Sequence, residues 1–156
     1  MSIKRLNHAV LYVRDATASA AFYCRVLGFR VAADMGGQAV FLRADGSDND
    51  HDLGLFSVGD QPPHAQRRVG LYHLAWQVHT IDELAIMRTR LAEAGVLVGQ
   101  SDHGVSVSLY AHDPDGIEFE VMWARPRSDW PETPGTWQLD LDAALARWAG
   151  VDTSDQ

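Results

Sequence analysis

The first half of the chain opens with a strand-like alternation of apolar and polar positions. Over residues 6–13 successive side chains alternate between two faces, and His8 lies on one of them. Apolar residues then recur at helical spacing over 18–27, and Gly28 suits the left-handed position that ends a helix. Strand-like runs follow at residues 29–33, 38–43 and 52–58. The pattern therefore predicts a strand, a helix and three strands.

The second half repeats this order. A strand-like run at 70–78 carries His73, a helix is predicted from Ile81 to about Ala94, and strands are predicted at 96–99, 105–110 and 117–123. His73 follows His8 by 65 residues, so the halves read as two copies of one βαβββ unit. We place the units at about residues 3–58 and 69–124, joined by a proline-containing polar linker at 59–68.

Residues 125–156 form a C-terminal extension of different character. Its first part is irregular, and apolar residues then share one helical face over about 140–149. We expect this helix to dock on the rest of the chain, although a lid or a dimer contact is also compatible with the pattern. The predicted class is α+β, with a single domain over 1–124 and this extension.

Charge and composition exclude several functions. The 156 residues carry a formal charge of -8, which leaves no basic surplus to neutralise nucleic-acid phosphates. No apolar run approaches the roughly 20 residues of a membrane helix, and the N-terminus shows no signal-peptide pattern. Cys24 is the single cysteine, so an internal disulfide is excluded. We expect a cytoplasmic protein without nucleic-acid or membrane partners.

Three side chains are candidate metal ligands. His8 and His73 occupy equivalent positions of the two units, and Glu120 lies on a late strand, on the same side as Tyr110 in the predicted alternation. Two imidazoles and one carboxylate can hold a divalent metal and leave positions open for substrate. Subtracting 65 from 120 gives Leu55, so only the second unit supplies a carboxylate and one metal site is predicted. A sheet with one solvated face would show the same alternation, but the placement of His8 and His73 at equivalent positions of the two units favours a role as metal ligands.

With these residues the chain resembles the vicinal oxygen chelate superfamily, which includes extradiol catechol dioxygenases, glyoxalase I, epimerases, thiol transferases and bleomycin-binding proteins. The resemblance covers roughly residues 3–124. It implies an eight-stranded, incompletely closed mixed barrel, built from the two units around a metal cleft. Superfamily members often form dimers, and free sheet edges favour association, so a homodimer is expected.

Within the superfamily the chain is most similar to the extradiol dioxygenases. Their signature is matched in order and spacing by His103, Leu109-Tyr110, Asp113-Pro114, Gly116 and Glu120, whereas Ser101 departs from it. The resemblance implies Fe(II) bound by His8, His73 and Glu120, with a catechol-like aromatic and dioxygen as substrates. It also implies His103 as the acid/base residue and Tyr110 as a hydrogen-bond partner of the substrate. The roles of His51 and His64 stay open, although either could border the pocket.

Two other functions remain open. A superfamily lyase, isomerase or thiol transferase could use the same residues with Mn, Zn or Ni, and Mn(II) or another divalent ion could also replace iron in a dioxygenase. Glyoxalase I is disfavoured because it needs a carboxylate from the first unit, where Leu55 stands. A non-catalytic drug-binding protein is the third possibility, although such proteins usually lack the metal ligands that this chain retains.

Overall fold

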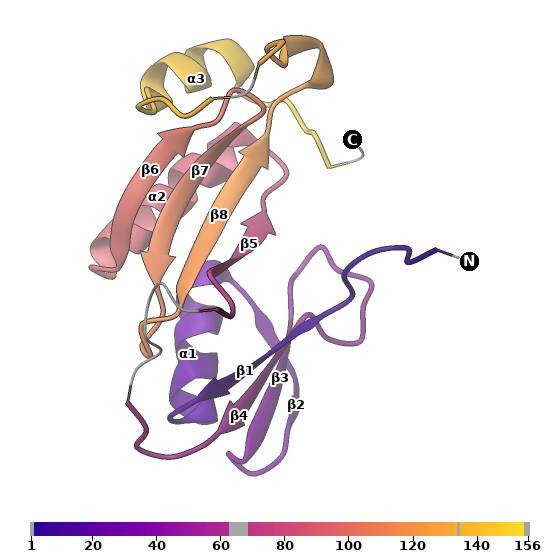
Figure 1. Cartoon of the computed structure of the whole chain (residues 1–156), viewed down its shortest axis with the longest axis vertical. Helices are drawn as coiled ribbons and strands as arrows, with labels where there is room; N and C mark the ends of the chain where they lie inside the picture. Colours follow the sequence, from indigo (N-terminus) through magenta and orange to yellow (C-terminus); the bar gives the residue numbers. More distant parts are fainter. Residues whose placement is uncertain (1, 63–68, 134, 155–156) are drawn as a thin grey trace. The chain divides into compact units, whose positions relative to one another are not determined.

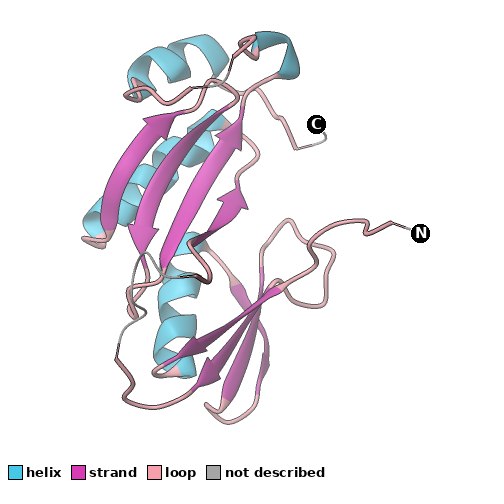
Figure 2. Ribbon diagram, in the orientation of Figure 1, coloured by secondary structure: helices cyan, strands magenta, loops and turns pink. Residues whose placement is uncertain are grey.

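The computed structural model describes residues 2–62, 69–133 and 135–154. The chain divides into two compact units, Met1–His64 and Ala65–Gln156. In the described part of the chain each unit contains one four-stranded mixed sheet with a helix against it (Figures 1 and 2). His64 and part of the predicted linker lie outside the described residues.

Unit 1 is a βαβββ unit with the strand order β1-β4-β3-β2. Strand β1 pairs in parallel with β4, and the other pairs are antiparallel. Helix α1 begins after Asp15, whose carboxylate accepts a hydrogen bond from the Ala18 amide, and ends at Gly28 with a φ of 78°. Its apolar face packs on the sheet and covers Leu42 and Leu53 among others. The elements are β1 (Ala9–Val13), α1 (Ala16–Leu27), β2 (Arg30–Asp34), β3 (Ala39–Arg43) and β4 (Leu53–Ser57).

Unit 2 repeats this topology with the strand order β5-β8-β7-β6. Thr80 caps helix α2, because its hydroxyl accepts a hydrogen bond from the Glu83 amide. The helix covers the sheet face that carries Leu109, Phe119 and Trp123, all of which are buried. The opposite sheet face carries polar side chains. The elements are β5 (His73–Gln77), α2 (Ile81–Glu93), β6 (Leu97–Asp102), β7 (Ser106–His112) and β8 (Glu118–Ala124).

The C-terminal extension folds onto unit 2. A 3-10 helix η1 (Arg127–Asp129), which the sequence pattern does not predict, precedes helix α3 (Leu141–Trp148). Trp148 is 7% exposed and its ring lies 5.8 Å from that of Trp123 in the core. Figure 1 shows α3 at one end of this sheet. The extension is therefore a packed part of unit 2.

The α+β class and the two βαβββ units are confirmed. The two histidines stand at the starts of their strands rather than inside them, since His8 precedes β1 and His73 is the first residue of β5. No helix among the described residues is long and apolar enough to cross a membrane.

Candidate metal centre

The register of the second sheet brings His73, Tyr110 and Glu120 to one face. Strand β5 pairs His73 with Glu118 and Ala75 with Glu120, while β7 pairs Tyr110 with Glu120. Side chains two residues apart on a strand point to the same face. Glu118 and Glu120 therefore flank His73 from the neighbouring strand, and Tyr110 lies on the other side of Glu120.

His73 lies between two carboxylates. Its Nε2 is 3.0 Å from Oε2 of Glu120, and its Nδ1 is 3.6 Å from Oε1 of Glu118. The second distance exceeds that of a hydrogen bond, and the buried Nδ1 has no hydrogen-bond partner among the described residues. Glu118 also lies 3.7 Å from Nε2 of His112. Nε2 of His73 and the Glu120 carboxylate are thus the pair that can bind a metal, whereas Glu118 lies on the Nδ1 side of the ring.

Tyr110 joins this pair to His103. The Tyr110 hydroxyl is 2.7 Å from Nε2 of His103, and the Tyr110 and His73 ring centroids are 5.9 Å apart. Burial and then the negative charge of Glu120 raise the pKa of Tyr110 above its ordinary value. The phenol therefore keeps its proton at neutral pH and can donate it in a hydrogen bond.

A tight turn before β8 fixes the strand that carries Glu120. Asp113 Oδ1 accepts hydrogen bonds of 2.9 Å from the amides of Asp115 and Ile117, and Gly116 has a φ of 80°. The side chain of Asp113 therefore binds the backbone of its own turn.

In unit 1 the ring of His8 is held by neighbouring amides. Its Nδ1 lies 2.9 Å from Oδ1 of Asn7, an atom that can only accept, so Nδ1 carries the hydrogen and the lone pair of Nε2 is available. Asn7 is braced in turn by Asn49, whose side chain donates to the Asn7 carbonyl at 2.9 Å. His8 is exposed in its unit. This tautomer is the one required of a ligand that binds through Nε2.

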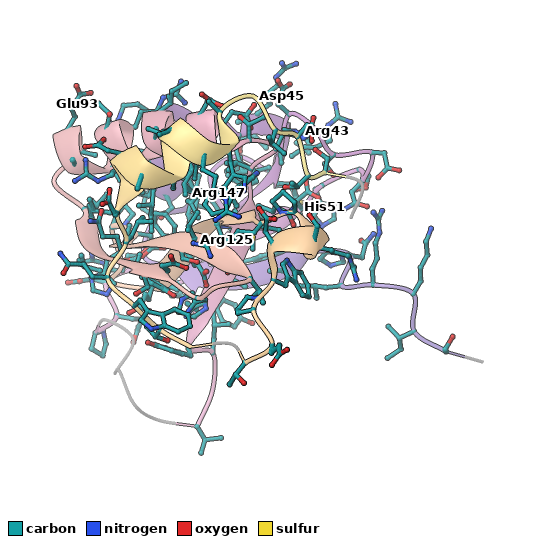
Figure 3. All side chains as sticks on the ribbon, turned by 90° about the horizontal axis from the view of Figure 1, so that it is seen from above. Arg43, Asp45, His51, Glu93, Arg125 and Arg147 are labelled. Carbon is teal, nitrogen blue, oxygen red and sulfur yellow. The ribbon has the colours of Figure 1, made fainter. Side chains whose placement is uncertain are left out.

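His51 is a neighbour of His8 whose role the sequence left open. The two ring centroids are 4.5 Å apart, and Nδ1 of His51 lies 2.7 Å from Oδ2 of Asp50. Ala9 pairs in parallel with Leu53, which places residue 51 beside the start of β1. The contact between His8 and His51 thus follows from a strand register that the sequence pattern does not give. His51 is labelled in Figure 3.

The equivalence between Glu120 and Leu55 is off by one residue. Ala75 pairs with Glu120, and Val10, the counterpart of Ala75 in unit 1, pairs with Gly54. Leu55 instead points into the core and is fully buried. The reason is that residue 9 pairs with residue 53, 44 positions on, whereas residue 73 pairs with residue 118, 45 positions on, so the whole segment from β1 to β4 is one residue shorter than that from β5 to β8. Because Gly54 has no carboxylate either, the predicted asymmetry between the units is unchanged.

The donor set fits a divalent metal bound through nitrogen and oxygen. Nε2 of His73 and a carboxylate oxygen of Glu120 are already adjacent, and the tautomer of His8 presents a free nitrogen lone pair. No three His, Cys, Asp or Glu side chains in the described parts of either unit are grouped as a complete metal site. The adjacent pair His73 and Glu120 belongs to unit 2, and His8 of unit 1 stays a predicted ligand.

Comparison with known proteins defines the family. Residues 5–121 match the model of the Glyoxalase/Bleomycin resistance protein/Dioxygenase superfamily, so the chain belongs to this family. It is 38% identical over 130 residues to a catechol-2,3-dioxygenase of Bacillus subtilis (strain 168), an alignment that covers 80% of this chain and 43% of that protein. It is 33% identical over 121 residues to a biphenyl-2,3-diol 1,2-dioxygenase 3 of Rhodococcus globerulus, covering 76% and 62% of the two chains. The chain thus spans less than two thirds of either relative.

Solved structures share the fold. A glyoxylase/bleomycin resistance protein/dioxygenase domain from Frankia sp. EAN1pec matches with a TM-score of 0.64 and 26% identity, covering 80% of this chain and all of that one. A glyoxalase/dioxygenase from Nostoc punctiforme matches with a TM-score of 0.66 and 20% identity, covering 79% and 92%. The predicted superfamily is therefore confirmed.

Proposed function

We propose that the chain is a non-haem Fe(II) dioxygenase of the extradiol type, which opens the ring of a catechol-like aromatic with dioxygen. The observation that carries the proposal is that His73, Glu120 and Tyr110 share one sheet face and that the loop after β6 brings His103 to the Tyr110 hydroxyl. His103, Tyr110 and Glu120 occur in the order and spacing of the extradiol signature. Two relatives whose alignments cover 80% and 76% of this chain are named as dioxygenases of aromatic diols.

In this proposal His8, His73 and Glu120 hold the metal. When bound, Fe(II) with two neutral imidazoles and one carboxylate supplies adjacent open positions for two vicinal substrate oxygens and for dioxygen. Mn(II) has the same ligand preferences and is the second candidate metal. Binding both substrates at one ion would remove the entropic cost of bringing them together.

Two residues of unit 2 would handle protons and orient the substrate. The Tyr110 hydroxyl, kept protonated by burial and by the charge of Glu120, would donate a hydrogen bond to a substrate oxygen. His103 is in hydrogen-bond contact with that hydroxyl and would accept and return a substrate proton, a role for which imidazole is suited near neutral pH. His51, next to His8 and oriented by Asp50, is a second imidazole with the same capability.

Oxygen uptake tests the proposed reaction. Protein reconstituted with Fe(II) without oxygen is mixed with an oxygenated solution of catechol, and dioxygen consumption is followed with an electrode. We expect one dioxygen consumed per catechol, and no uptake with phenol, which lacks the second oxygen needed for chelation. The Glu120→Ala variant should be inactive because it lacks the anionic ligand. Absence of uptake by the iron-loaded wild type across a panel of substituted catechols would contradict the proposal.

A further inference from the structure

We infer that Thr136, in the C-terminal extension, is a positioning residue for His103: its hydroxyl holds the imidazole by Nδ1 so that Nε2 meets the Tyr110 hydroxyl. The functional weight of this contact rests on the proposed role of His103 and Tyr110. The family model ends at residue 121, so Thr136 lies outside the matched segment.

The backbone places residues 103 and 136 opposite each other. Asp102 and Trp137 form an isolated antiparallel bridge, in which each amide donates to the other's carbonyl, at 3.0 and 2.8 Å. The next pair along such a ladder, residues 103 and 136, is the pair without mutual hydrogen bonds, whose side chains approach more closely. The proximity of His103 and Thr136 therefore follows from main-chain pairing.

The side chains complete a chain of hydrogen bonds. Nδ1 of His103 lies 3.2 Å from the Thr136 hydroxyl oxygen, and Nε2 lies 2.7 Å from the Tyr110 hydroxyl oxygen. With the Tyr110 hydroxyl donating to Nε2, the hydrogen of the neutral imidazole lies on Nδ1, which donates to the Thr136 hydroxyl. Both ring nitrogens are thereby engaged, which fixes the rotation of the ring.

Gly104 lets the extension lie directly on the loop of His103. A Cβ on Gly104 would lie 2.7 Å from Cγ of Pro131 and 3.1 Å from the ring of Trp137, and Gly104 also has a φ of 77° that favours glycine. A larger residue at position 104 would push the extension away from the loop.

The extension is anchored firmly enough to position a side chain. Arg125 pairs with Asp102, donates to the Gly104 carbonyl at 3.2 Å, and places its guanidinium 4.6 Å from the Trp148 ring. Arg125 and Arg147 are labelled in Figure 3, and the guanidinium of Arg147, a residue of α3, is also 4.6 Å from that ring. Since the Trp148 ring packs on Trp123 in the core, the segment that carries Thr136 is tied to unit 2 at both ends.

The test compares three variants by histidine NMR and by activity. Thr136→Val keeps the shape of the side chain without the hydroxyl, Thr136→Ser keeps the hydroxyl, and Thr133→Val is the control in the same extension. Thr136 is exposed, so these changes should leave the fold intact. In metal-free protein labelled with ¹⁵N-histidine, we expect the His103 signals, assigned by their loss in His103→Gln, to show the Nδ1–H tautomer in the wild type. Thr136→Val should shift them, whereas Thr136→Ser and Thr133→Val should not.

In the iron-loaded enzyme, Thr136→Val should lower kcat for catechol by about 2- to 10-fold, the range of one net hydrogen bond, at unchanged iron content. Thr136→Ser, which keeps the hydroxyl, should have the wild-type kcat. Wild-type His103 signals together with wild-type kcat in Thr136→Val would overturn the inference. Failure of the proposed function would be seen separately, as an inactive iron-loaded wild type, and the NMR comparison would then still decide whether Thr136 holds His103.

Discussion

At the scale of single residues, the Glu118 carboxylate next to Nδ1 would support His73 as a metal ligand. A metal-bound histidine commonly donates its second N–H to a carboxylate or carbonyl, which fixes the ring and increases its basicity. Oε1 of Glu118 lies 3.6 Å from Nδ1 of His73, so a small rotation of the ring on metal binding would complete this hydrogen bond. His112, 3.7 Å from the other Glu118 oxygen, braces the carboxylate from the opposite side.

Removing Glu118 should therefore weaken metal binding. We expect Glu118→Ala to lower Fe(II) affinity roughly 10–100-fold, the usual cost of losing such a partner, and Glu118→Gln to lower it less because an acceptor oxygen remains. The affinity is measured without oxygen, by competition with a chromophoric chelator. Glu93→Ala, at the exposed end of α2 and labelled in Figure 3, is the matched control. Wild-type affinity in Glu118→Ala would show that the carboxylate does not support His73.

The sequence indicated His73, Glu120 and Tyr110 but not Glu118. Alternation alone places Glu118 and Glu120 on the same face and does not say which one meets the ligand nitrogen. The distinction comes from the parallel register of β5 and β8, in which His73 pairs with Glu118 while its Nε2 reaches toward Glu120. Roles that depend on which ring nitrogen faces which neighbour require the structure.

At the scale of elements, the loop before β4 supports His8 and His51. Asp52 closes this loop by accepting hydrogen bonds from the Ala44 amide at 2.8 Å and from the side chains of Ser47 and Asn49 at 2.7 Å each. Burial by itself would raise the pKa of Asp52, but these hydrogen bonds outweigh it and lower the pKa below its ordinary value. The same Asn49 braces Asn7 beside His8.

Asp52→Ala should therefore destabilise the protein. The donors of Ala44, Ser47 and Asn49 are half-buried, so we expect a total loss of unfolding free energy of about 1–3 kcal/mol at pH 7. Because the pKa of Asp52 is lower in the folded state, its contribution is present above the unfolded value of about 3.9 and is lost as pH falls through the folded value. Urea unfolding followed by circular dichroism between pH 7 and 3 should show that acidification lowers the unfolding free energy less in the variant than in the wild type.

Asp60→Ala, at an exposed position, is the control for that experiment. An Asp52→Ala protein with wild-type stability at pH 7 would show that the loop does not depend on the carboxylate.

Alternation and helix caps were sufficient to predict the α-helices and the strands, but not how the strands pair. Asp15, Gly28 and Thr80 bound the helices where the local sequence indicates, because capping is a local interaction. The pairing of β1 with β4 joins segments more than 40 residues apart, and one residue fewer in the connection moved the equivalent of Glu120 from Leu55 to Gly54. The contact between His8 and His51 was missed for the same reason.

At the scale of the whole molecule, the duplication is the feature from which the metal site was predicted. Each βαβββ unit places a histidine at the start of its first strand, and only unit 2 adds a carboxylate on its last strand. The C-terminal extension follows no repeat, so its contact with His103 through Thr136 had no signal in the sequence pattern. Thr136 therefore brings to His103 a hydroxyl from a part of unit 2 that lies outside the βαβββ repeat.

The metal content of protein purified without oxygen tests whether His8, His73 and Glu120 bind Fe(II). Elemental analysis of the wild type should give close to one iron per chain, and Glu120→Ala should lose it, whereas Glu93→Ala should retain it. Manganese, zinc or nickel in place of iron would favour a lyase, isomerase or thiol transferase at the same residues. Metal content that is unchanged in Glu120→Ala, or a wild type that binds no divalent metal under these conditions, would contradict the proposed metal centre.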